Sequence, residues 1–244
     1  MMKRILFFIF LVGIVFSASS QYGNFFRGIG IFVGPNTTAH TYINAGALAK
    51  DPNNPVFNDY YPQNHTSGDY INLGAGILLE FLRYDRIRWQ TEIEYTGKGA
   101  VEKERDWLTG TEIGLGVNTY QYIQWNNYLK YFWYQGDRGD WYVMVGGKLE
   151  FNFSRSTPIY AAVAGTFPAF WFSGDVAIGR EFFTWKRFHP FIELHWNPDL
   201  FFQPPRITTT VISRTFELRF GIIYRPLKKS IDDCNAPKYH GNYN

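Results

Sequence analysis

The segment Arg86–Lys98 alternates polar and apolar side chains with a period of two, and this pattern constrains the fold more than any other feature of the chain. Two is the period of a β-strand, whose successive side chains point to opposite faces. One face is therefore predicted to be ionic, and the other carries Ile87, Trp89, Ile93 and Tyr95. Because no segment of the sequence has a convincing helical period, we predict an all-β protein.

The alternation recurs along the chain and predicts eight strands. The clearest further cases are Ile71–Phe81 and Trp141–Ser154. Five weaker segments fit the same template: Phe25–Gly34, Asn118–Tyr131, Phe170–Glu181, Phe188–Asn197 and Val211–Arg225. The parity of Asn118–Tyr131 stays open, since aromatic and polar residues occupy both of its faces.

The predicted connections alternate between long and short. Arg83–Arg86 is a tight turn, whereas Gly99–Val117 is one of the long connections, as is the polar stretch between Gly34 and Ile71. An up-and-down barrel has this alternation when its short turns face the periplasm and its longer loops face outward. A soluble antiparallel meander does not require it.

Composition excludes several classes of protein. The 244 residues include 23 Phe, 17 Tyr and 8 Trp, yet the mean hydropathy is slightly negative, so apolar residues are interleaved with polar ones. This excludes a polytopic helical membrane protein. A net charge of +3, with no basic run beyond Lys228-Lys229, predicts no nucleic-acid partner. With one cysteine and no pair of histidines at helical metal-binding spacing, we predict no disulfide framework, metal site or cofactor.

The first twenty residues have the organisation of an export signal. Lys3 and Arg4 precede the apolar run Ile5–Phe16, and the small residues Ser17–Ser20 follow it. The apolar run is too short to span a bilayer, which takes about 20 residues. We therefore predict a signal peptide over residues 1–20, a barrel over 21–225 and a periplasmic C-terminal tail over 226–244. An N-terminal anchor is the alternative for the first segment.

Periodicity does not reveal which face of the strands lies inside. A soluble barrel hides its apolar face, whereas a membrane barrel turns that face to lipid and holds the charges in its lumen. Glycines on the polar face suit the narrow interior of an eight-stranded barrel, and aromatic residues near strand ends are typical of interfacial girdles. We predict an eight-stranded antiparallel up-and-down transmembrane β-barrel, surrounded by lipid in the outer membrane of a Gram-negative bacterium. The alternative is a secreted lipocalin-like, lipid-binding barrel.

The predicted lumen holds a network of charged side chains. Its members are Glu80, Arg88, Glu92, Glu94, Lys98, Lys148, Glu150, Asp175, Glu193, His195, Glu217 and Arg219. Acids outnumber bases, which implies interior water or one or two protonated carboxyl groups. Because eight strands leave no open channel, we interpret the network as a structural plug rather than a transport path.

The chain resembles a known class of barrels. The predicted signal peptide ending in Ser before Gln21, the first strand "GIGIFVG" and the third strand "RWQTEIEYTGKGA" are similar to outer-membrane β-barrel families common in Bacteroidota, which share the architecture of OmpA-type barrels. The resemblance covers about residues 21 to 225. Some members of this class are accessory barrels of the type IX secretion machinery, so the resemblance implies a structural or protein-interaction role, with the anchoring of a secretion or envelope complex among its forms.

An enzymatic role is the main functional alternative. Glu193, His195 and Asn197 share one face, and a His beside a carboxylate could act as a general base in a lipid A-modifying enzyme. Such enzymes need a serine nucleophile close to the His on the lipid side, and the His-Trp-Asn run offers none. We predict no catalytic residue and assign His195 to the lumen, hydrogen-bonded to Glu193.

The predicted tail contains the cysteine of the chain, Cys234. An exported compartment is oxidising, and a lone cysteine there suggests an intermolecular disulfide or a reactive thiol. We predict that the tail docks on a periplasmic or outer-membrane protein, with Cys234 as the candidate for the disulfide. A frayed chain end is the alternative.

Overall fold

The computed structural model describes residues 26–43, 64–82, 84, 86–105, 111–156, 169–183, 187–198 and 210–226. The predicted signal peptide lies outside these residues, and so does the predicted tail beyond Pro226, including Cys234. Within the described ranges, no helix has the length and apolarity needed to cross a membrane.

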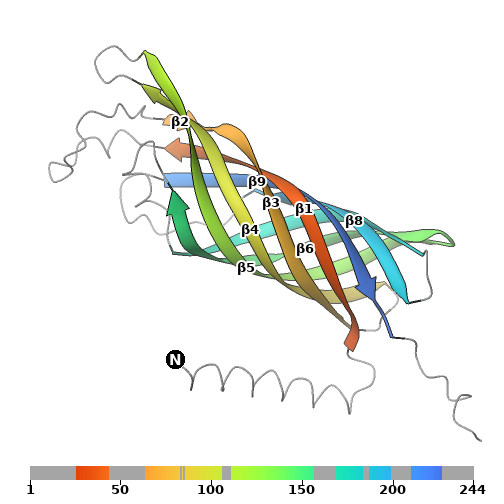
Figure 1. Cartoon of the computed structure of the whole chain (residues 1–244). Coiled ribbons are helices and arrows are strands. Elements are labelled where there is room, and N and C mark those ends of the chain that lie inside the picture. The colour runs from red at the N-terminus through yellow and green to blue at the C-terminus, as the bar shows by residue number, and fades with distance from the viewer. Residues whose placement is uncertain are drawn as a thin grey trace, which may run out of the picture.

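The described residues form a closed antiparallel barrel (Figure 1). The strands are β1 (Phe26–Ile43), β2 (Asn64–Thr66), β3 (Gly68–Phe81), β4 (Ile87–Arg105), β5 (Glu112–Gly136), β6 (Gly139–Ser156), β7 (Phe170–Phe182), β8 (Phe188–Asn197) and β9 (Thr210–Tyr224). The eight long strands pair with their neighbours in chain order, and β1 pairs with β9 to close the ring. The short strand β2 pairs with the end of β1. The prediction of an all-β, eight-stranded, up-and-down barrel is confirmed.

The two ends of the barrel differ in their connections. The pairs β3–β4, β5–β6 and β7–β8 are joined by short turns at one end, called here the short-turn end. The connections after β1, β4, β6 and β8 emerge at the opposite end, called here the loop end. In a bacterial outer-membrane barrel the short turns face the periplasm.

The strands β1, β4 and β5 extend further toward the loop end than predicted. The predicted connection Gly99–Val117 is largely strand, because β4 continues to Arg105 and pairs with β5 from Glu112 onward. Likewise, β1 continues past Gly34 to Ile43. The hydrogen-bond ladder persists there although the alternation of polar and apolar residues fades. The outer wall there no longer needs to be apolar, so the alternation of hydropathy did not predict these extensions.

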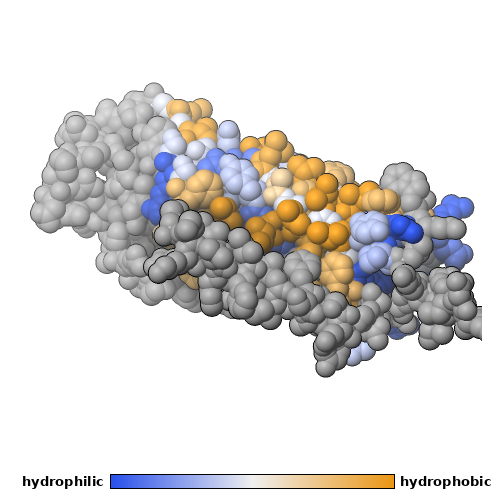
Figure 2. Space-filling view, turned by 60° about the horizontal axis from the view of Figure 1, so that its bottom comes forward, coloured by the Kyte–Doolittle hydropathy of each residue, from blue (hydrophilic) through white to orange (hydrophobic). Residues whose placement is uncertain are grey.

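The polarity of the wall is inverted relative to a soluble protein. The outward side chains of the strands are apolar and exposed, for example Ile31, Ile77 and Ile93, whereas charged side chains fill the interior. Figure 2 shows the apolar surface gathered along the middle of the molecule, with hydrophilic residues toward the ends. The structure also settles the parity of β5: even-numbered residues from Asn118 to Phe132 are buried inside, and Trp125 and Leu129 point outward.

Glycines in the wall make room for aromatic rings in the lumen. Four aromatic residues each lie directly opposite a glycine of the neighbouring strand: Phe32 and Gly76, Tyr128 and Gly146, Tyr142 and Gly179, and Phe191 and Gly221. A Cβ at Gly179 would lie 2.5 Å from the Tyr142 ring, and one at Gly221 would overlap the Phe191 ring. The glycines thus let rings lie across the inner wall of a narrow barrel.

Candidate functional site

The lumen is the candidate functional site. The twelve residues assigned to it from the sequence all lie buried inside the barrel. Ten acidic side chains and five lysine or arginine side chains are buried among the described residues. The contacts between them form a central network, a cluster near the short-turn end and a smaller cluster toward the loop end.

Arg219 of β9 occupies the centre of the network. Its guanidinium donates to Glu92 at 2.8 Å, to Glu94 at 2.5 Å and to Glu217 at 2.9 Å. Two of these carboxylates come from β4, across the lumen from β9, and the Arg219 guanidinium also lies 4.5 Å from the centre of the Phe32 ring. One cation therefore ties together three carboxylates, and all of these side chains are almost completely buried.

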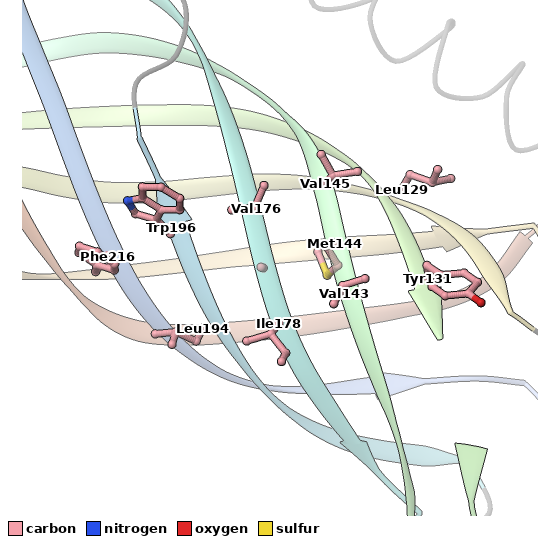
Figure 3. Close-up of a pocket in the computed structure, with 11 residues that line it drawn as sticks. Leu129, Tyr131, Val143, Met144, Val145, Val176, Ile178, Leu194, Trp196 and Phe216 are labelled. Carbon is pink, nitrogen blue, oxygen red and sulfur yellow. The ribbon is translucent and has the colours of Figure 1, made fainter. Parts of the chain in front are cut away.

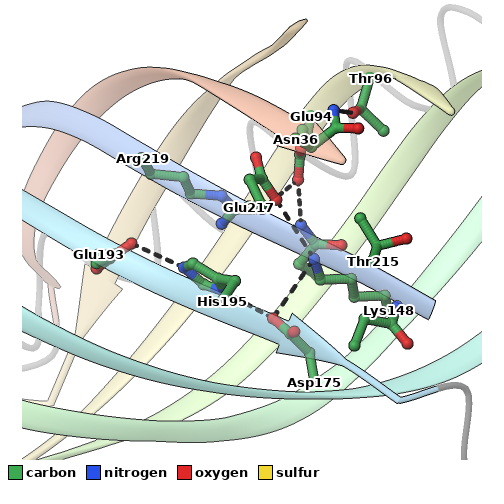
Figure 4. A network of polar contacts seen from close by, with 12 residues as sticks. Asn36, Glu94, Thr96, Lys148, Asp175, Glu193, His195, Thr215, Glu217 and Arg219 are labelled. Carbon is green, nitrogen blue, oxygen red and sulfur yellow. Dashed lines mark hydrogen bonds and ion pairs between the residues drawn. The ribbon is translucent and has the colours of Figure 1, made fainter. Parts of the chain in front are cut away.

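His195 belongs to the same network and is flanked by two carboxylates (Figure 4). Its Nδ1 lies 2.7 Å from Asp175, and its Nε2 lies 3.1 Å from Glu193. The Tyr128 hydroxyl donates to Asp175 at 2.6 Å, and the Tyr142 hydroxyl donates to Glu193 at 2.8 Å. Each carboxylate is thus fixed by a hydroxyl as well as by the imidazole.

Lys148 of β6 links the two halves of the central network. Its Nζ lies 3.4 Å from Asp175 and 3.7 Å from Glu217, so it joins the carboxylate beside His195 to one beside Arg219. A continuous chain of charges therefore runs across the lumen. Charges this deeply buried depend on such pairing, since an ion without a partner costs several kcal/mol.

A second cluster lies near the short-turn end. Arg225 donates to the carboxylates of Glu80 and Glu181. Arg88 donates to Glu181 at 3.3 Å, and Lys130 donates to Glu80 at 3.3 Å. Here three cations surround two carboxylates, whereas around Arg219 one cation binds three carboxylates.

A third, smaller cluster lies toward the loop end. Lys98 donates to both oxygens of Glu150, at 2.7 and 2.8 Å. The Ser173 hydroxyl donates to Glu150 at 3.1 Å, and the Asn197 amide donates to Ser173 at 2.8 Å.

The short-turn end opens into a polar depression. It has a volume of about 570 Å³ and is lined by Arg27, Arg88, Gln135, Gly136, Asp137, Asp140, Phe183, His189 and Arg225. Its floor is the cluster around Glu80 and Glu181. This is the mouth of the lumen on the side from which the chain continues after β9.

Several members of the network were not predicted from the sequence. Glu181 has the same parity as Asp175 on β7, and Arg225 has the same parity as Arg219 on β9, so the alternation itself could have found both. Lys130 and Tyr128 were missed because the parity of β5 was open. Tyr142 was not predicted because it is an uncharged aromatic residue, and the charged residues on the polar faces defined the predicted network.

The contacts of His195 place it inside the lumen network. Both ring nitrogens of His195 contact carboxylates, so neither is directed at a hydroxyl that it could activate. The ring is 1% exposed and faces the lumen rather than the lipid. Among the described residues, no group of three or more His, Cys, Asp or Glu side chains could hold a metal ion.

Comparisons with known proteins found similarity in structure and none in sequence. No family model matches the chain, and no curated protein sequence matches it. The outer membrane protein OprG from Pseudomonas aeruginosa is similar over 83% of this chain and 98% of its own, with 10% identity and a TM-score of 0.47. Neisserial surface protein A is similar over 80% and 97%, with 11% identity and a TM-score of 0.43. The outer membrane protein AlkL is similar over 84% and 92%, with 13% identity and a TM-score of 0.42.

The assignment to a membrane rests on the polarity of the two faces of the barrel. A closed, even-numbered antiparallel barrel with an apolar outer band and a charged lumen is the architecture of bacterial outer-membrane barrels. The protein is a β-barrel of the outer membrane of a Gram-negative bacterium.

Proposed function

We propose that this protein is a non-enzymatic outer-membrane barrel whose lumen is a structural plug and whose ends serve protein interaction. The observation that supports this is the filled interior: Arg219, Tyr128, Tyr142, Lys130 and Phe132 are among the largest fully buried side chains. The central charges face one another across the lumen rather than lining a passage. A barrel filled in this way offers partners its loops, its mouth and its tail.

The tail is the proposed contact with a periplasmic partner. The last described strand ends at Tyr224 at the short-turn end, which supports a periplasmic position for the tail. The residues that follow include Lys228, Asp232 and Cys234, which offer charge and one thiol to a partner. In this role the protein anchors an envelope or secretion complex to the outer membrane. The type IX machinery is one such complex, as the resemblance of the sequence implies.

The first experiment tests the plugged barrel. A barrel closed by strand-to-strand hydrogen bonds has no free edge and should resist detergent until boiled. Unboiled protein should therefore migrate differently from boiled protein, and purified protein should add no conductance to planar bilayers. Identical migration together with release from membranes by carbonate would refute the membrane barrel, whereas stable single-channel currents would refute the plug.

The second experiment tests the tail. Membranes from wild type and from Cys234→Ser are run on gels with and without reductant. A higher-mass band that disappears with reductant, and that Cys234→Ser lacks, is expected. Deletion of Ile231–Asn244 should release the partner from detergent-solubilised complexes while leaving heat-modifiable migration intact. If every co-purifying protein survives the deletion, the tail does not anchor a complex.

The enzymatic alternative has its own test. His195→Gln should leave the mass spectrum of lipid A from expressing cells unchanged. A change in lipid A that depends on the wild-type protein and is lost in His195→Gln would favour the lipid A-modifying enzyme.

A further inference from the structure

An arginine interrupts the apolar outer wall near the short-turn end. On β7 the outward set is Phe170, Phe172, Val176, Ile178, Arg180 and Phe182. Apart from Arg27, which lines the mouth, the other charged side chains that the structure describes on the outward face of the strands lie toward the loop end, namely Asp69, Lys103, Arg155 and Arg214. A charge that faces lipid is costly, so its surroundings should explain its presence.

The surroundings of Arg180 hold the guanidinium without neutralising it. It lies 5.2 Å from the centre of the Trp141 ring and 5.0 Å from the centre of the Phe182 ring. Trp141 is its direct partner on β6, and Ile192 is its partner on β8. No acidic side chain of the described residues pairs with Arg180, and its Nε is buried without a hydrogen-bond acceptor. The rings orient the cation, and an anion is still needed to neutralise it.

The position of Arg180 identifies the depth at which that anion would lie. It is two residues from the end of β7, at Phe182, and Trp141 is two residues from the start of β6, at Gly139. Tryptophan and arginine at strand ends are typical of the headgroup region of a bilayer. The abundant anions of that region are lipid phosphates, for which a guanidinium provides matching donors.

An apolar groove lies on the outer wall (Figure 3), and its lining includes Ile178, two residues before Arg180 on β7. It has a volume of about 500 Å³ and is lined by Leu129, Tyr131, Val143, Met144, Val145, Val176, Ala177, Ile178, Leu194, Trp196 and Phe216. Val143 is the outward neighbour of Trp141, and Ile178 is the outward neighbour of Arg180. In Figure 3 the small residues Val143 and Val176 lie between Tyr131 on one side and Trp196 on the other.

We propose that Arg180 and this groove together form a binding site for one phospholipid of the periplasmic leaflet. The lipid phosphate binds the Arg180 guanidinium between the rings of Trp141 and Phe182. One acyl chain lies in the groove, over Val143, Val176 and Ile178. Arg180, which has no acidic partner among the described residues, and the neighbouring apolar groove match the two chemical parts of a phospholipid. Inorganic phosphate would use the cation alone, and a second copy of the chain would need the groove alone.

The site can be tested by native mass spectrometry of the full-length protein in non-ionic detergent. The probes are dipalmitoyl phosphatidylglycerol, dipalmitoylglycerol, which lacks the phosphate, and inorganic phosphate. Wild type should retain one phosphatidylglycerol, and the other two probes should be retained poorly. Arg180→Gln should weaken that binding about tenfold, the scale expected for the loss of one charge-assisted contact.

Two further variants separate the parts of the site. Val176→Trp, which fills the groove, should also weaken phosphatidylglycerol binding, whereas Arg214→Gln, an outward arginine toward the loop end, should leave it unchanged. Heat-modifiable migration verifies that each variant is folded. Equal binding by Arg180→Gln and Arg214→Gln would overturn the proposal, as would equal retention of dipalmitoylglycerol. A dimer that Val176→Trp disrupts, with no lipid retained, would assign the groove to a second copy and also overturn it.

Discussion

The inner and outer faces of the barrel place neighbouring residues of one strand in opposite surroundings. On β4, Ile93 points outward and is 60% exposed, whereas the next residue, Glu94, points inward and is completely buried. Glu94 is held by Arg219 at 2.5 Å and by Asn126 at 2.8 Å. Ile93 requires only an apolar solvent. The stability of the inner face therefore depends on particular partner residues, whereas that of the outer face depends on the side chains being apolar.

This difference predicts how each face responds to substitution. An inner charge is matched to named groups on other strands, so its removal leaves those groups buried and unpaired. An outer side chain contacts fluid lipid, so an apolar replacement costs little and a charged one costs much.

The largest effect is expected on the inner face. Arg219→Gln leaves three carboxylates without their shared cation and should lower the free energy of unfolding by about 3–5 kcal/mol. Urea titration of protein refolded into lipid vesicles measures it. Arg219→Lys, which keeps the charge but has fewer donors, should fall between wild type and Gln. If Gln and Lys behave alike, the charge of Arg219 is not what stabilises the network.

A charge on the outer face should have the next largest effect. Ile93→Arg places a guanidinium against lipid in the middle of β4 and should cost about 2–4 kcal/mol in the same assay. Ile93→Leu is the matched control and should be close to neutral. A neutral Ile93→Arg would mean that this part of the wall is not covered by lipid.

Substitution of a glycine on each face compares the two faces again, with a smaller expected effect on stability. Gly179→Ala adds a Cβ within 2.5 Å of the Tyr142 ring and should cost about 1–3 kcal/mol through overpacking. Gly147→Ala adds a methyl group on the outer face, 3.1 Å from the Phe172 ring, which is exposed and can move aside. Its effect on unfolding should be smaller. Equal losses would show that room for the lumen rings is not the reason for the glycine.

The smallest effect is expected where β4 and β5 extend beyond the predicted strands. Lys103 and Glu112 form an ion pair at 2.9 Å, with side chains that are 56% and 47% exposed. Because solvent screens such pairs, Lys103→Gln should change the free energy of unfolding by about 0–1 kcal/mol. A loss comparable to that of Arg219→Gln would contradict the distinction between buried and exposed charge pairs.

Much of the fold follows from local patterns of residues. Period-two alternation is a local property of a strand, so it is enough to identify the eight strands and to place Glu92, Glu94 and Arg219 on their polar faces. The same pattern, followed to the strand ends, also places Glu181 and Arg225. Strand bounds were less well predicted where β1, β4 and β5 continue past the apolar band, since hydrogen bonding there no longer requires an apolar outer face.

Which side chains contact one another depends on how the strands are arranged in the closed barrel. Arg219 binds Glu92 and Glu94 across the lumen, and Lys148 bridges Asp175 and Glu217, because ring closure and register bring distant strands to the same level. The pairing of lumen rings with glycines and the inward face of β5 depend on the same register. Alternation separates the two faces of a strand. The partner of a residue across the barrel is set by the shear, which is the stagger of the strands in the closed ring, and a local pattern of residues does not determine the shear.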